Sequence, residues 1–98
     1  MKILVIFHPL AEEEFRNSFR YYEQQLPGLG LRFEKEVEYN LERISEKPES
    51  FGFDFGTYRK VALDNFPFVI VYRFDQVKHM IYIASIHHTK RNPSLKYR

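Results

Sequence analysis

The sequence predicts a single α+β domain over residues 1–98, in which a helical hairpin covers one face of a mostly antiparallel sheet. In two stretches separated by "PGLG", apolar residues recur every three or four positions, which is the period of an amphipathic helix. Three later runs are rich in Val, Ile, Phe and Tyr and are divided by turn-forming residues, as in an antiparallel meander. The length of 98 residues suits one ordinary domain.

The first half of the chain predicts one strand and two helices. Residues 1–8 are dense in Ile, Leu, Val and Phe, which indicates a buried strand that ends at Pro9. A helix is predicted over residues 10–26, because three Glu side chains near its start suit the positive end of the helix dipole. The "PGLG" turn breaks it, and a second helix is predicted over residues 29–47. The side chains expected to face the sheet are Phe15, Phe19, Val37, Leu41 and Ile44.

The second half predicts a loop and then three strands. Residues 46–56 hold two Gly, one Pro and three Phe, which indicates a loop whose aromatic side chains are pinned to the core. Strands are predicted over residues 58–63, 66–74 and 79–87. The segments "DN" and "DQVK" between them have the length and composition of hairpin turns, so the three strands should pair in order.

Composition excludes several functional classes. The chain has no Cys, so it has no disulfide framework and no thiolate nucleophile, which fits a reducing cytoplasm. The apolar run in "MKILVIF" is too short for a signal-peptide core or a membrane span, so we expect a cytoplasmic protein. His8 and His79 have no recognisable ligand spacing, and we expect neither a metal nor a cofactor.

Charge is divided unevenly along the chain. Residues 1–54 carry 7 basic and 11 acidic side chains, whereas residues 55–98 carry 8 basic and 2 acidic side chains. The two parts therefore have net charges of −4 and +6, although the whole chain has only +2. This asymmetry indicates that a basic surface meets a polyanion or an acidic partner, unless the charges only keep the domain soluble.

Several strings in the sequence resemble the RelE/ParE superfamily of bacterial toxins from type II toxin–antitoxin modules. They are "YYEQQLPGLGLRF" at 21–33, "LERISEKPESF" at 41–51, "YRKVALDNFPFVIVYR" at 58–73 and "IYIASIHHTKRNP" at 81–93. The resemblance implies a toxin that a cognate antitoxin protein wraps and neutralises, and whose oligomeric state the antitoxin sets. It is compatible with the seventeen Phe and Tyr side chains, because surplus aromatic residues on a small domain often mark a groove for a peptide.

One branch of the superfamily comprises endoribonucleases that cut mRNA on the ribosome. The resemblance implies a catalytic role there for Arg91 and for Tyr97, six positions later, and His88 is the candidate acid or base. His87 and His88 are neighbours on a predicted strand and should face opposite sides, so at most one of them is catalytic. The Arg that this branch carries in its third strand is replaced by Val69.

The ParE branch, whose characterised members poison DNA gyrase by binding it, needs no such set of residues, and we favour this hypothesis. The basic tail would then dock on an anionic surface of its target. The residues expected to bind the target or a nucleic acid are Arg59, Lys60, Arg73, His87, Lys90, Lys96 and Arg98. The alternatives left open are the ribonuclease and a toxin-fold domain with neither activity.

Overall fold

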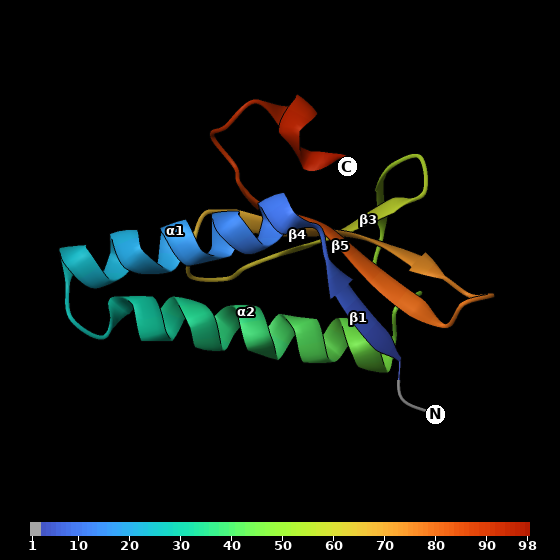
Figure 1. The fold of residues 1–98 in the computed structure, drawn as a ribbon, viewed down its shortest axis with the longest axis horizontal. Coiled ribbons are helices and arrows are strands. Elements are labelled where there is room, and N and C mark those ends of the chain that lie inside the picture. Colours follow the sequence, from blue (N-terminus) through green and yellow to red (C-terminus); the bar gives the residue numbers. More distant parts are fainter. Residues whose placement is uncertain (1–2) are drawn as a thin grey trace.

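Two antiparallel helices cover one side of the sheet, as the sequence predicted. The computed structural model describes residues 3–98. Helix α1 is Pro9–Gln25 and helix α2 is Leu29–Glu46, and Figure 1 shows them side by side as a hairpin. Within the described residues, neither helix combines the length and the apolarity that crossing a membrane requires.

The turn between the helices is fixed by one carboxylate. Glu23 accepts hydrogen bonds from the backbone N–H groups of Gly28, at 3.0 Å, and Leu31, at 3.2 Å, and so satisfies donors at the start of α2. Gly28 has a left-handed φ of 92°, which glycine adopts readily. At Gly30 an added Cβ would lie 2.6 Å from the carbonyl oxygen of Phe19, so the close approach of the helices requires glycine there.

The sheet has five strands in the order β1-β5-β4-β3-β2. Their bounds are Leu4–Phe7 for β1, Phe53–Phe55 for β2, Tyr58–Ala62 for β3, Phe68–Asp75 for β4 and Met80–His88 for β5. Strand β1 pairs in parallel with β5, and all other pairs are antiparallel, so the predicted meander is confirmed. The first two residues of the strand predicted over residues 1–8 lie outside the described residues.

The loop predicted over residues 46–56 differs from the structure in two ways. It contains the short strand β2, which pairs with β3 at the edge of the sheet. Phe51 packs against the core as expected, but Phe53 and Phe55 are 61% and 64% exposed. At this edge the Phe53 ring lies 3.9 Å from the Arg59 guanidinium and the Phe55 ring lies 5.1 Å from that of Tyr97, so both contact neighbours on the surface and not the core.

The main core lies between the hairpin and the sheet, on what we call the helix face. Val37 and Ile44 of α2 are buried there, and Phe15 and Leu41 pack against the same cluster. Phe19, also predicted to face the sheet, is half-buried and lies outside that cluster. The strands contribute Ile70, Tyr72, Ile81, Ile83 and Ile86, all almost fully buried.

The opposite side of the sheet is covered by residues 89–98, which we call the strap. The strap contains one turn of 3₁₀ helix, η1, over Pro93–Lys96. Figure 1 shows it in red, turning back from the end of β5 toward the start of α1. Tyr97 packs against a small cluster of Val69, Val71 and Ala84, so this second side, the strap face, also has a buried centre.

Candidate functional site

An acid on the edge strand β2 joins three polar groups on the strap face. Asp54 accepts a hydrogen bond of 2.7 Å from the Tyr97 hydroxyl and pairs with Lys60 at 3.2 Å and Lys96 at 3.4 Å. Burial opposes its ionisation, but the hydrogen bonds from Tyr97 and Lys60 outweigh burial and hold its pKa below the ordinary value. The same hydrogen bond raises the pKa of Tyr97 to about 12. Three groups that could bind an anion are therefore already bonded to one carboxylate.

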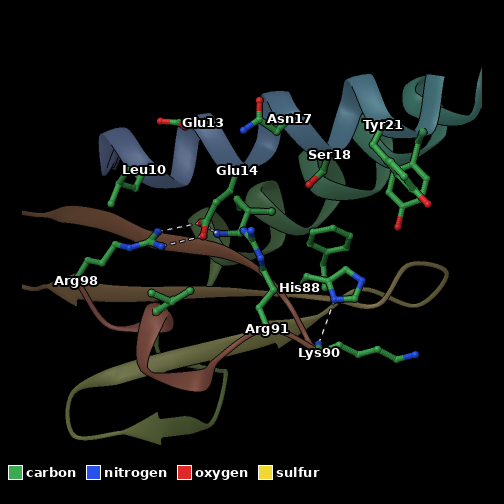
Figure 2. Close-up of a pocket in the computed structure, with 14 residues that line it drawn as sticks. Leu10, Glu13, Glu14, Asn17, Ser18, Tyr21, His88, Lys90, Arg91 and Arg98 are labelled. Atoms are coloured by element: carbon green, nitrogen blue, oxygen red, sulfur yellow. Dashed lines mark hydrogen bonds and ion pairs between the residues drawn. The ribbon is translucent and has the colours of Figure 1, made fainter. Parts of the chain in front are cut away.

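A second ion pair joins the strap to α1. Arg98 and Glu14 form two parallel hydrogen bonds, of 2.9 and 2.8 Å, and both side chains are largely buried (Figure 2). The register of β4 and β5 shifts beside Ala84, which leaves local backbone groups without strand partners. Glu14 accepts the N–H of Ile86 and Arg98 donates to the carbonyl of Ala84, so the pair also completes this bulge.

The two neighbouring histidines lie on opposite faces, as predicted. His87 pairs across the ladder with Val69 and is 1% exposed beneath the strap. Burial lowers its pKa, Lys96 acts in the same sense, and Glu14 partly offsets them. His88 pairs with Phe68, against whose ring it packs edge-on, and it faces α1.

Two arginines of the sheet are held by their neighbours. Arg59 donates to the backbone carbonyls of Glu49 and Phe51 on the helix side, and its guanidinium lies 3.9 Å from the centre of the Phe53 ring. Arg73 lies on the strap face, 5.3 Å from the Tyr58 ring and 5.0 Å from the Tyr82 ring. Tyr58 in turn donates to the carbonyl oxygen of Arg98.

A cleft of about 690 Å³ runs between α1 and the strap, and we call it the α1 cleft. Figure 2 shows Leu10, Glu13 and Tyr21 on its α1 side, with His88 and Arg91 on the other side. Three of its lining side chains are large, apolar and 43–57% exposed: Leu10, Tyr21 and Leu95. Lys90 and Arg91 are exposed at its edge, and neither forms an ion pair with another residue of the described chain. The cleft therefore combines exposed apolar side chains on both sides with two cations and one acid, Glu13, that have no ion-pair partner within the described residues.

Comparison with known proteins decides the family. A family model described as "ParE toxin of type II toxin-antitoxin system, parDE" matches residues 5–93, nearly the whole chain. The chain belongs to the ParE toxin family. No curated protein matches the sequence.

Two solved structures share the fold of this ParE-family toxin. One is described as "Chromosomal ParDE TA system from P. aeruginosa", with a TM-score of 0.77 and 14% identity, covering 91% of this chain and 98% of that one. The other is a mutant of E. coli toxin RelE in the free state, with a TM-score of 0.68 and 19% identity, covering 92% of this chain and 86% of that one. At such identities the likeness shows the fold alone.

The residues named by the ribonuclease hypothesis have different surroundings in this ParE-family toxin. Arg91 and His88 share the α1 cleft, whereas the Tyr97 hydroxyl is bonded to Asp54 on the strap face. Val69 is buried in the strap-face cluster, where it packs as an apolar side chain. Within residues 3–98, no group of three or more acidic or His side chains is arranged to hold a metal ion.

Of the residues predicted to bind a target, only some remain free of acidic partners within the described residues. Lys90 is exposed at the α1 cleft, Lys60 and Lys96 pair with Asp54, and Arg98 pairs with Glu14. Sequence reasoning missed both acids. Asp54 stands 43 residues before Tyr97 and Glu14 stands 84 before Arg98, so no local pattern links either pair.

Proposed function

We propose that this toxin acts by binding its target, DNA gyrase, and that an antitoxin neutralises it by occupying the α1 cleft. The observation that carries the first part is the position of Asp54. A ribonuclease without a metal needs free cations around the phosphate whose charge grows in the transition state. On the strap face Tyr97, Lys60 and Lys96 are instead bonded to the carboxylate of Asp54, so they are not free to bind a phosphate.

The free cations lie at the α1 cleft instead. Lys90 and Arg91 extend from the turn of the strap, where they are exposed and have no acidic partner within residues 3–98. Exposed cations beside exposed apolar side chains suit docking on an anionic protein surface, because charge steers the encounter and apolar contact holds the complex. Lys96 and Arg98, which the sequence also assigned to docking, serve to hold the strap in place.

The proposed binding site of the antitoxin is the same cleft. Leu10, Tyr21 and Leu95 expose apolar surface that an amphipathic segment would cover, and Lys90 and Arg91 would attract acidic residues on that segment. Binding there would cover the cations that dock on the target. Neutralisation is then occlusion of a shared surface and needs no change in the fold of the toxin.

One experiment separates the possible targets. The toxin is produced from a tightly controlled promoter, and DNA-damage reporter activity, amino-acid incorporation and message integrity are followed in parallel. We expect the DNA-damage response to rise while protein synthesis is still normal and messages are intact. The purified toxin should also inhibit supercoiling by gyrase. Rapid cleavage of ribosome-bound message would overturn the proposal and support the ribonuclease instead. The observation that supports this alternative is that His88 and Arg91 line the same cleft.

Matched variants test the docking surface. Lys90→Glu combined with Arg91→Glu should remove toxicity and gyrase inhibition, because both changes reverse a charge at the cleft. Lys78→Glu, an exposed cation on the turn between β4 and β5, should keep both activities. Equal toxicity of the two proteins at equal abundance would show that the target docks elsewhere. Growth unaffected by the unsubstituted toxin would instead indicate a domain without activity.

A second pair of variants tests the antitoxin site, with the small protein encoded beside this toxin as the probe. Leu10→Asp should leave the toxin active but insensitive to that protein, because it puts a charge on an apolar part of the α1 cleft. Leu31→Asp is the control, since Leu31 is equally exposed but lies at the start of α2 outside the cleft. Neutralisation of both variants alike would exclude the cleft as the antitoxin site.

A further inference from the structure

The strap covers a pair of buried polar side chains. Ser85 and His87 of β5 are 0% and 1% exposed, and their ladder partners Val71 and Val69 place them on the strap face. The Ser85 hydroxyl and both ring nitrogens of His87 lack a well-formed hydrogen bond within the described chain; the backbone of Arg91 is near enough to the ring to oppose the lowering of its pKa, but burial outweighs it. A buried polar group without a partner is destabilising, so the closed strap covers groups that would be more stable in water.

Charged groups from four elements surround His87. They are Lys96 and Arg98 of the strap and Glu14 of α1, with Asp54 of β2 and Lys60 of β3 joined to them through Lys96. A proton on His87 would therefore place a third cation beneath two cations of the strap, with both nearby carboxylates already paired. Neutral imidazole suits this position and imidazolium does not.

We propose that the strap is a hinged cover, held by the Arg98–Glu14 and Tyr97–Asp54 contacts, which opens over β5 when His87 gains a proton at mildly acidic pH. Its hinge is the start of the strap, where Thr89 donates to the carbonyl of Pro67 and Arg91 donates to that of His88. The helix face has no part in the movement, because its packing lies on the other side of the sheet.

The direction of the pH effect follows from the two environments of His87. In the closed form burial lowers its pKa, with Lys96 acting in the same sense, whereas in the open form the imidazole is in water with its ordinary pKa of about 6.5. The open form therefore binds the proton more tightly. Closure is fully favoured above pH ~6.5 and weakens as the pH falls below it. Asp54, whose pKa is lowered, stays ionised throughout this range.

Opening would also dismantle the α1 cleft. Arg91, Leu95 and Arg98 form its strap side, so a ligand that needs both sides of the cleft binds only the closed form. By linkage, such a ligand would stabilise closure to the same extent that closure strengthens its binding. Acidification and cleft ligands would then act on one equilibrium in opposite directions.

The chain has no Cys, so a single introduced thiol reports opening directly. In the Ser85→Cys variant the thiol lies beneath the strap. Its rate of reaction with a maleimide is measured and divided by the rate for the urea-unfolded protein at the same pH, which removes the pH dependence of the thiol itself. We expect this ratio to rise about tenfold between pH 7.5 and pH 5.5, since pH 5.5 is one unit below the open-form pKa of His87. Val37→Cys, buried on the helix face, is the control for global unfolding and should stay slow at both values.

Second substitutions in the Ser85→Cys protein assign the effect. His87→Leu should abolish the acceleration, His88→Gln should retain it, and Glu14→Gln should raise the rate already at pH 7.5. Equal ratios at both pH values, or an acceleration that survives His87→Leu, would overturn the proposal. If His87→Leu does not fold, the imidazole proton resonances of the unsubstituted protein decide. A His87 that titrates at or above 6.5 while the Tyr97 ring signals stay fixed would exclude the switch.

Discussion

The two faces of the sheet are closed by different forces. The helix face buries Phe33, Val37 and Ile44 of α2 against strand residues such as Ile70 and Ile83, and it is held by apolar contact. The strap face has a small apolar centre, and its cover is tied down by carboxylates from outside the strap. Apolar burial depends little on pH and salt, whereas charge pairs and their hydrogen bonds depend on the ionisation of each partner.

Stability and the proposed opening of the strap therefore depend on different faces of the sheet. Ten or more apolar residues share the helix face, so no single protonation can disturb it. The strap depends on two carboxylates, Asp54 and Glu14, each of which bonds several groups at once. Local opening is therefore expected on the strap face at conditions where the helix face remains intact.

The largest effect is expected on the helix face. Ile44→Ala should lower the free energy of unfolding by about 2–5 kcal/mol, because Ile44 is almost fully buried in the main core. The loss should be the same at pH 5.5 and pH 7.5. Urea unfolding measures it, with Leu31→Ala, a half-exposed leucine, as the control. An unfolding midpoint equal to that of the control would mean that the side of α2 that carries Ile44 does not pack against the sheet.

Glu14→Gln should have the next largest effect. The substitution leaves Arg98 largely buried without its counter-ion, and we expect a loss of about 1.5–3 kcal/mol in urea unfolding at pH 7.5. Glu13→Gln is the control, since its exposed side chain makes no ion pair within residues 3–98. Equal stability of the two variants would show that the strap is not held by this pair.

Tyr97→Phe should cost less, about 1 kcal/mol at pH 7, because the lost hydrogen bond is to a charged oxygen but is partly open to water. The pKa of Asp54 is lowered in the folded protein, so this stabilisation is present above pH ~3.8 and is lost as the pH falls through the folded-state pKa. Unfolding of both proteins across pH 7 to 3 should show the difference shrinking. Tyr39→Phe, on an exposed tyrosine, serves as the control, and a pH-independent difference would exclude Asp54 as the cause.

The smallest effect is expected on the outer side of α1. Glu12 pairs with Arg16 at 2.9 Å, but both side chains are more than half exposed. Glu12→Gln should change the free energy of unfolding by less than about 0.5 kcal/mol, because water screens the pair. A loss as large as that of Glu14→Gln would remove the contrast between buried and exposed pairs on this helix.

The sequence predicted the hairpin and the meander because their signals are local. Apolar spacing identifies α1 and α2 to within one residue at each end of the ranges 10–26 and 29–47. Alternation along β5 likewise places His87 and His88 on opposite faces. The three residues of β2 carry no such signal, since two glycines flank them and both phenylalanines remain exposed.

The partners of the basic residues could not be predicted in this way. Lys96 and Arg98 were predicted to belong to a free cationic tail, because nothing near them in the sequence is acidic. The contacts of the strap with Asp54 and Glu14 join residues 42 to 84 positions apart, so only the complete fold brings them together. Charge distributed along a sequence indicates a basic segment, but the fold decides which of its cations remain unpaired.

The parallel pairing of β1 with β5 has a consequence for synthesis on the ribosome. Residues 4–7 have no partner in the sheet until residues 80–88 have been made, because β5 is the strand that joins β1 to the rest (Figure 1). The hairpin and the edge strands can form earlier, but neither the sheet nor the strap can close. The nascent sheet therefore remains incomplete until β5 has been made, and Lys90 and Arg91, which we propose bind the target, follow directly after it.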